Sequence, residues 1–125
     1  MQVVCGVVER EGKVLICKRS GNVPYAGYWE FPSDVLLEGE TLEGTLETSL
    51  FERISTISGK TERLFAFDSR CEPGARFFVV KVKFLETKGG LNGYDAAKWI
   101  RLAKIRKYRL FPDCVTIVKE LQKIT

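Results

Sequence analysis

The chain has 125 residues, a net charge of +4, 45% hydrophobic residues and 29% charged residues, which is typical of one soluble globular domain. No apolar run approaches the roughly 18 residues that a membrane span needs, so no membrane partner is expected. The N-terminus also lacks the basic start and long apolar block of a signal peptide. We therefore expect a single cytoplasmic domain over residues 1–125.

The cysteine pattern argues against a zinc site. Four cysteines lie at positions 5, 17, 71 and 114, no CxxC pair occurs, and the chain has no histidine. Cys5 and Cys17 fall on two strands of an expected hairpin, and a one-residue choice of register decides whether they face each other. Buried free thiols are the ordinary state in a cytoplasmic protein, with a disulfide as the alternative.

The first 40 residues predict extended structure. Gln2–Val8 and Lys13–Arg19 are apolar and rich in β-branched residues, and Glu11-Gly12 between them supplies a turn, so we expect a hairpin. Tyr28–Pro32 is predicted as a short aromatic strand, and Ser33–Glu40 as another extended piece.

A helix is predicted after Thr41, whose hydroxyl can cap it. Its apolar residues recur every four positions and define one buried face: Leu42, Leu46, Leu50 and Ile54. Gly59 is expected to end this region.

The second half predicts three strands and a terminal helix. Leu64–Asp68 and Arg76–Glu86 are expected as strands joined by a Cys-Glu-Pro-Gly turn, and Lys98–Leu102 as a last strand. The terminal helix follows Pro112, with Val115, Val118, Leu121 and Ile124 on its apolar face. This pattern indicates an α/β or α+β domain with a mixed sheet.

Residues 27–56 read GYWEFPSDVLLEGETLEGTLETSLFERIST, and this stretch resembles the Nudix box of MutT-like nucleotide pyrophosphohydrolases. That box has the pattern G-x5-E-x7-R-E-U-x-E-E-x-G-U, where U is a bulky apolar residue. Only Glu40, Leu50 and Glu52 fit it. The other specified positions hold different residues: Asp34, Thr48, Ser49, Arg53, Ser55 and Thr56.

The resemblance extends over nearly the whole chain. GVVEREGKVLICKRS is similar to the opening hairpin of Nudix proteins, YAGYWEFP to the strand before the box, and WIRL followed by LFPD to the closing segment. It implies an α/β/α sandwich around a mixed β-sheet, in which the box forms a loop, a helix and a loop.

The altered residues bear on the metal chemistry that the resemblance implies. Nudix hydrolases hold Mg²⁺ with carboxylates on one helix face, and these carboxylates correspond to Ser49, Glu52 and Arg53. Only Glu52 remains, and Arg53 places a cation where a metal ligand would stand. We therefore expect Mg²⁺-dependent hydrolysis to be lost or weak. The alternative is a rearranged metal site built from Glu52 with Glu40, Asp34 or Asp95.

Four further residues match positions that contact nucleotide in MutT-like proteins. The resemblance implies that Arg19 meets a phosphate, that Phe31 packs beside a base and that Arg76 opens the strand lining the pocket. Asp113 or Cys114 falls at a base-reading position. Each has an alternative: core packing for Phe31, solvated strand ends for the arginines and a helix N-cap for Asp113.

A basic segment spans Lys98–Arg109, with the sequence KWIRLAKIRKYR. It holds six cations and no acid, so the rest of the chain carries a net charge of −2. A solvated face is the ordinary explanation, and binding to nucleic acid or to an acidic protein is the alternative.

Three functions follow from these observations. The first is a Nudix-like protein that binds a nucleotide or other phosphorylated ligand, a nucleic acid or a protein without Mg²⁺-dependent hydrolysis. The second is an active pyrophosphohydrolase with a rearranged site. The third is a structural subunit or homodimer without a small ligand.

Overall fold

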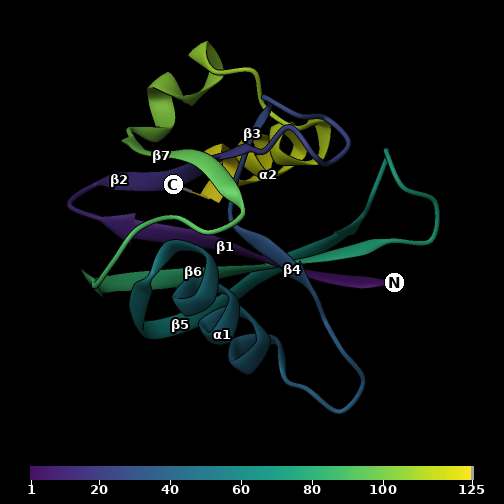
Figure 1. The fold of residues 1–125 in the computed structure, drawn as a ribbon. Helices are drawn as coiled ribbons and strands as arrows, with labels where there is room; N and C mark the ends of the chain where they lie inside the picture. The colour runs from purple at the N-terminus through teal and green to yellow at the C-terminus, as the bar shows by residue number, and fades with distance from the viewer. Residues whose placement is uncertain (125) are drawn as a thin grey trace.

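The structure, a computed structural model, describes residues 1–124 and has one mixed sheet between two helices (Figure 1). Its elements in chain order are β1 (Gln2–Arg10), β2 (Lys13–Arg19), β3 (Trp29–Glu30), β4 (Ser33–Val35), α1 (Leu42–Ile54), β5 (Thr56–Asp68), β6 (Arg76–Thr87), β7 (Tyr94–Ile100), the 3₁₀ helix η1 (Leu102–Lys107) and α2 (Pro112–Ile124). No helix among these residues is long and apolar enough to cross a membrane. The α/β/α sandwich expected from the sequence is confirmed.

The sheet has the order β3-β2-β1-β6-β5, with β4 paired to β1 and β7 paired to β2. Only β1 and β6 run parallel; the other pairs are antiparallel. Near its end, β1 pairs with β2 at Glu9 and Arg10, whereas near its start it pairs with β4 from Val3 to Cys5. The same edge of β1 is therefore paired with β4 at its start and with β2 at its end.

Strand β1 runs through the middle of the molecule and is buried on both faces. Val3, Cys5 and Val7 face the core that α2 covers, whereas Val4 and Val8 face the core that α1 covers. This two-sided burial explains why β1 is almost continuously apolar.

Helix α1 forms as predicted. Thr41 has extended backbone angles, and its Oγ1 accepts a hydrogen bond from Gly44 N at 3.0 Å. The four leucine and isoleucine side chains of the predicted apolar face are all buried. Gly6 of β1 lies beneath this face, where an added Cβ would come within 3.0 Å of Leu46, so glycine allows the helix to pack closely on the sheet.

Three predicted boundaries are wrong. Gly59 does not end the helical region, because α1 stops at Ile54 and the chain pairs with β6 from Thr56 onward. The last strand begins at Tyr94 rather than Lys98, because β7 pairs with β2 along most of that strand. Leu102, predicted as the end of that strand, starts η1 instead.

The buried face of α2 is also rotated from the predicted one. Val115 is half-buried and Ile124 is exposed. The apolar side chains that this helix buries in the core are those of Cys114, Ile117, Val118 and Leu121. Val118 and Leu121 are therefore buried as predicted, whereas Cys114 and Ile117 take the places on this helix face that were predicted for Val115 and Ile124.

Candidate functional site

A cavity of about 600 Å³ opens where β4, α1 and the start of β7 meet. Part of its wall is apolar and includes Val3, Phe31, Phe77 and Phe111. The remainder is charged or polar and includes Arg19, Glu30, Asp34, Glu52, Arg53 and Tyr94. An apolar wall beside a few convergent polar groups is the usual form of a small-molecule site.

The three helix positions that correspond to metal ligands have different environments. Ser49 is buried, with 3% of its surface exposed, and does not line the cavity. Glu52 is exposed and lines the cavity, where it forms no ion pair with a described residue. Arg53, one residue further, also lines the cavity, and its side chain is 41% exposed.

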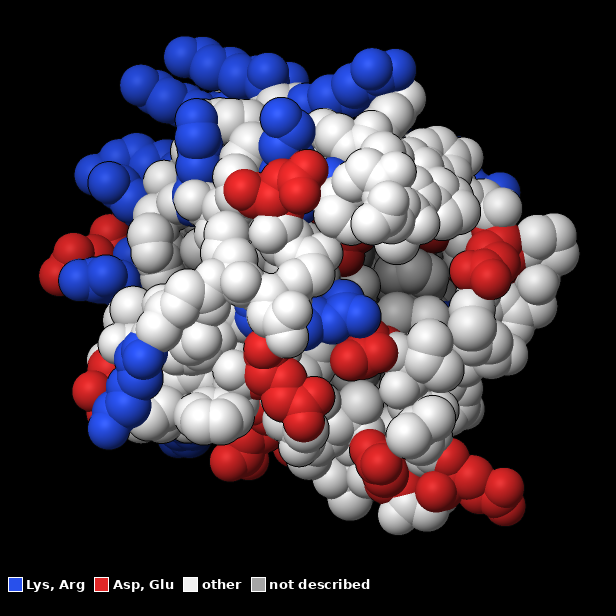
Figure 2. Space-filling view, in the orientation of Figure 1, with Lys and Arg blue, Asp and Glu red and all other residues white. Residues whose placement is uncertain are grey.

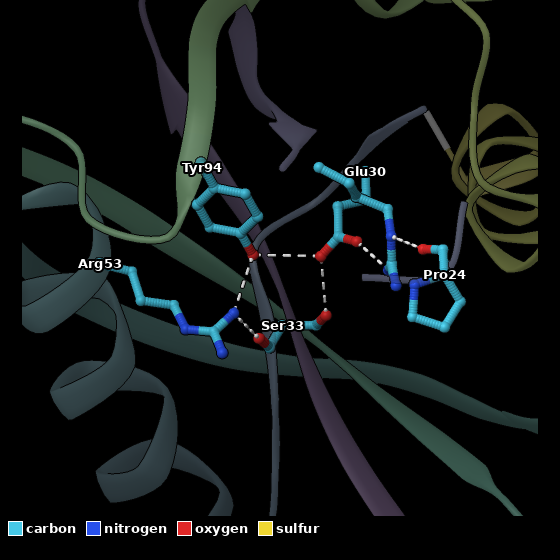
Figure 3. A network of polar contacts seen from close by, with 6 residues as sticks. Pro24, Glu30, Ser33, Arg53 and Tyr94 are labelled. Carbon is cyan, nitrogen blue, oxygen red and sulfur yellow. Dashed lines mark hydrogen bonds and ion pairs between the residues drawn. The ribbon is translucent and has the colours of Figure 1, made fainter. Parts of the chain in front are cut away.

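Arg53 extends from the last turn of α1 towards β4 and β7 (Figure 3). Its Nη1 donates to the Ser33 carbonyl and to the Tyr94 hydroxyl, both at 3.4 Å, and its Nε lies 3.9 Å from Asp34 Oδ2. Partial burial lowers the pKa of Arg53, but Tyr94, Asp34 and Glu30 outweigh it and raise that pKa overall. The guanidinium is therefore firmly charged, yet these long contacts leave it free to bind a further anion.

Glu30 is a buried carboxylate at the centre of the same network (Figure 3). It forms an ion pair with Arg19 and accepts hydrogen bonds from Ser33 Oγ at 3.2 Å and from Tyr94 Oη at 3.1 Å. Burial and the nearby Glu30 charge raise the pKa of Tyr94 far above its usual value, so its hydroxyl stays protonated and donates. Each polar group is thus satisfied, as buried groups require.

Neither Glu30 nor Tyr94 is among the predicted site residues. The signal for Glu30 was present, since a carboxylate within the aromatic run YWEF is unusual for a buried strand. No comparable signal marked Tyr94, whose partner Glu30 is 64 residues away in sequence.

The remaining acids considered as metal ligands do not gather around the cavity. Glu40 accepts a hydrogen bond from Thr45 Oγ1 at 2.7 Å, and Asp95 is exposed on β7. Asp34 does line the cavity, but one of its oxygens accepts from Val35 N at 2.9 Å and the other faces Arg53.

These donors do not fit Mg²⁺. Among residues 1–124, no group of three or more carboxylate, thiol or imidazole side chains is close enough to hold a metal ion. Mg²⁺ requires oxygen ligands at octahedral positions, and the Arg53 guanidinium would repel it at short range.

The residues expected to contact nucleotide divide into two pairs. Arg19 lines the cavity, where it bonds to Glu30 and to the Pro24 carbonyl and lies 4.8 Å from the ring centre of Phe111. Phe31 also lines it and is fully buried.

Arg76 and Asp113 do not line the cavity. Arg76 pairs with Asp68 at 2.9 Å. Asp113 lies inside the first turn of α2, so it is not the N-cap; its carboxylate accepts hydrogen bonds from Ser69 Oγ and Arg70 N. Asp113 therefore holds the loop between β5 and β6, while its neighbour Cys114 lines the cavity.

Cys5 and Cys17 lie on opposite faces of the sheet, so they do not form a disulfide. Cys5 and Cys114 are buried thiols in the cavity wall. Burial raises the pKa of both well above the ordinary value, which makes them poor nucleophiles.

No family model and no curated protein matches the sequence. Among solved structures, a MutT structure from a study of Aliivibrio salmonicida and Vibrio cholerae has a TM-score of 0.82 and 23% identity, covering 99% of this chain and 98% of that one. The E. coli ORF135 protein has a TM-score of 0.78 and 21% identity, and the match covers 98% of this chain and 89% of that one. The NUDIX domain of Shewanella oneidensis NrtR, complexed with ADP ribose, has a TM-score of 0.73 and 21% identity. This match covers 98% of this chain and 86% of that one. The chain therefore has the Nudix fold.

Proposed function

We propose that this chain binds a nucleotide or another phosphorylated ligand in the cavity and does not hydrolyse it with Mg²⁺. The observation that carries the proposal is the position of the Arg53 guanidinium. It stands on the cavity wall at a position where the resemblance implies a metal-binding carboxylate. A fixed cation there provides a counter-charge for phosphate while it opposes Mg²⁺.

The wall chemistry supports a particular class of phosphorylated ligand. Phe31, Phe77 and Phe111 provide apolar surface for a base, and Arg53 Nη2 donates no hydrogen bond to a described residue. Four carboxylates also line the cavity, those of Glu30, Asp34, Glu52 and Glu72. They disfavour a highly charged triphosphate, so we infer a diphosphate ester. The ADP ribose complex of the Shewanella oneidensis domain supports this choice.

The test is calorimetric titration of the purified chain with ADP-ribose, ADP and ATP, each in Mg²⁺ and in EDTA. We expect ADP-ribose to bind best and to bind equally well without metal. Arg53→Gln should weaken it about tenfold or more, because a charge-assisted hydrogen bond contributes about 1.5–3 kcal/mol. Arg63→Gln is the matched control, because Arg63 pairs with Glu43 and does not line the cavity.

Hydrolysis is tested in parallel on the same ligands with Mg²⁺ and Mn²⁺. We expect no metal-dependent turnover. Turnover at about 1 s⁻¹ or faster would overturn the proposal, as would the absence of binding by every ligand at millimolar concentration.

The second candidate is an active hydrolase with a rearranged site. It is favoured by one observation, that the Glu52 and Asp34 carboxylates line the same cavity. In that case Glu52→Gln should abolish turnover, and an unchanged rate would count against it.

A further inference from the structure

Four of the six cations in the basic segment Lys98–Arg109 lie on η1 or at its N-cap. A 3₁₀ helix has about three residues per turn, so side chains three apart lie above one another. Leu102, Ile105 and Tyr108 form the row that packs against the core. A second row contains Arg101, Lys104 and Lys107, and a third contains Ala103 and Arg106. These five residues are exposed, as is Arg109, which lies two residues beyond the end of η1.

None of the segment's six cations forms an ion pair with a carboxylate of residues 1–124. Two of them lie over aromatic rings instead: Lys98 over Trp29 and Tyr108, and Arg109 over Tyr28 at 4.2 Å. Figure 2 shows Lys and Arg gathered along the upper edge of the molecule, above the part where most acidic side chains lie. The charge of this edge is therefore not neutralised within the chain.

The surface is held rigidly. Ile105 is fully buried and anchors the middle of η1, and the segment continues directly from β7. A partner would therefore bind cations whose backbone is already fixed, and little ordering entropy would be lost.

The composition of the surface distinguishes between possible partners. None of the large hydrophobic residues that the structure exposes falls within 98–109. A protein interface needs an apolar centre, and a peripheral membrane surface needs side chains that insert. Binding to a phosphate backbone needs only Lys and Arg, and their effect comes from the release of counterions.

We propose that Lys98–Arg109 binds the phosphate backbone of nucleic acid without sequence preference. None of its residues lines the ligand cavity, so this surface acts independently of the function proposed above. Contacts to phosphate position a protein but carry no direct sequence information.

The test is fluorescence anisotropy with labelled 20-nucleotide single-stranded RNA, single-stranded DNA and duplex DNA of two unrelated sequences, over a salt series. We expect binding that weakens steeply with salt and differs little between the two sequences. Lys104→Glu/Lys107→Glu should weaken binding at least about tenfold at about 50 mM salt. Lys60→Glu/Lys83→Glu makes the same change in net charge on β5 and β6, at exposed lysines without ion pairs, and should weaken it less than about threefold.

Equal losses in the two double variants would overturn the proposal, because binding would then follow net charge alone. Absence of binding by the unaltered chain at about 50 mM salt would also overturn it. So would binding to phosphatidylserine vesicles or to polyglutamate as tight as binding to the oligonucleotides. A fold check by circular dichroism applies to both variants, and the Lys104→Ala/Lys107→Ala pair serves if charge reversal unfolds the chain.

Discussion

At the scale of single residues, the proposed loss of Mg²⁺-dependent hydrolysis rests chiefly on Arg53. One positive charge stands there beside Asp34 and Tyr94, in a cavity whose wall otherwise carries more carboxylates than guanidinium groups. Ser49 differs from the metal-binding glutamate that the resemblance implies both in its chemistry and in its location, because it is buried and does not line the cavity. A glutamate at position 49 would therefore bury a carboxylate, which costs several kcal/mol. Reversal of the charge at Arg53 is therefore the simpler test of whether this residue prevents Mg²⁺ from binding in the cavity.

Arg53→Glu should raise the affinity for Mg²⁺ by at least about tenfold, or about 1.4 kcal/mol. The substitution removes the repelling guanidinium and places a carboxylate beside those of Asp34 and Glu52. Calorimetric titration with Mg²⁺ measures the effect. Arg63→Glu makes the same change of charge outside the cavity, and an equal gain in that variant would show a general electrostatic effect instead.

At the scale of elements, the sequence pattern correctly predicted the features that depend on residues close together in the chain. The cap at Thr41, the apolar face of α1 and the β1–β2 hairpin all formed as expected. The starts of β5 and β7 were missed, because pairing with β6 and β2 sets them and residues 56–60 show no alternation of their own. The site was predicted in part for the same reason: Arg19, Phe31 and Asp34 line the cavity, whereas the Glu30–Tyr94 contact exists only after β3 and β7 dock on β2.

The end of α1 gives a prediction for one element boundary. Ser55 takes the left-handed conformation with φ 50° and ψ 33°, at the position where the resemblance implies a glycine. This conformation costs a non-glycine residue about 1 kcal/mol, but the Ser55 hydroxyl donates to the Gly90 carbonyl at 2.8 Å and recovers about 1 kcal/mol.

Ser55→Ala should therefore lower the free energy of unfolding by about 1 kcal/mol, because it keeps the strained backbone and loses the hydrogen bond. Ser55→Gly loses the same bond but relieves the backbone, so it should change stability by less than about 0.5 kcal/mol. Urea denaturation of the two variants measures the difference. Equal losses would mean that the backbone at position 55 is not strained.

At the scale of the whole molecule, the two-sided core places three thiols and one phenol out of water. Cys5 and Cys114 lie in the core under α2, and Cys17 and Tyr94 in the core under α1. Burial raises the pKa of all four groups. Their protonation is thus coupled to folding, and the pH dependence of stability reports how completely folding removes these groups from water.

We expect the free energy of unfolding to fall as the pH rises above about 8.5, where thiols of the unfolded chain begin to ionise. The native chain retains these protons because its thiol pKa values are raised, so each buried thiol costs up to about 1.4 kcal/mol per pH unit above that point. Urea denaturation between about pH 7 and pH 10 measures the slope. Cys114→Ala removes one buried thiol and should therefore make the slope less steep by the contribution of that thiol. The substitution also leaves a small cavity at position 114, which lowers the free energy of unfolding by the same amount at every pH and so does not change the slope. An unchanged slope in Cys114→Ala would mean that this thiol reaches water in the native state.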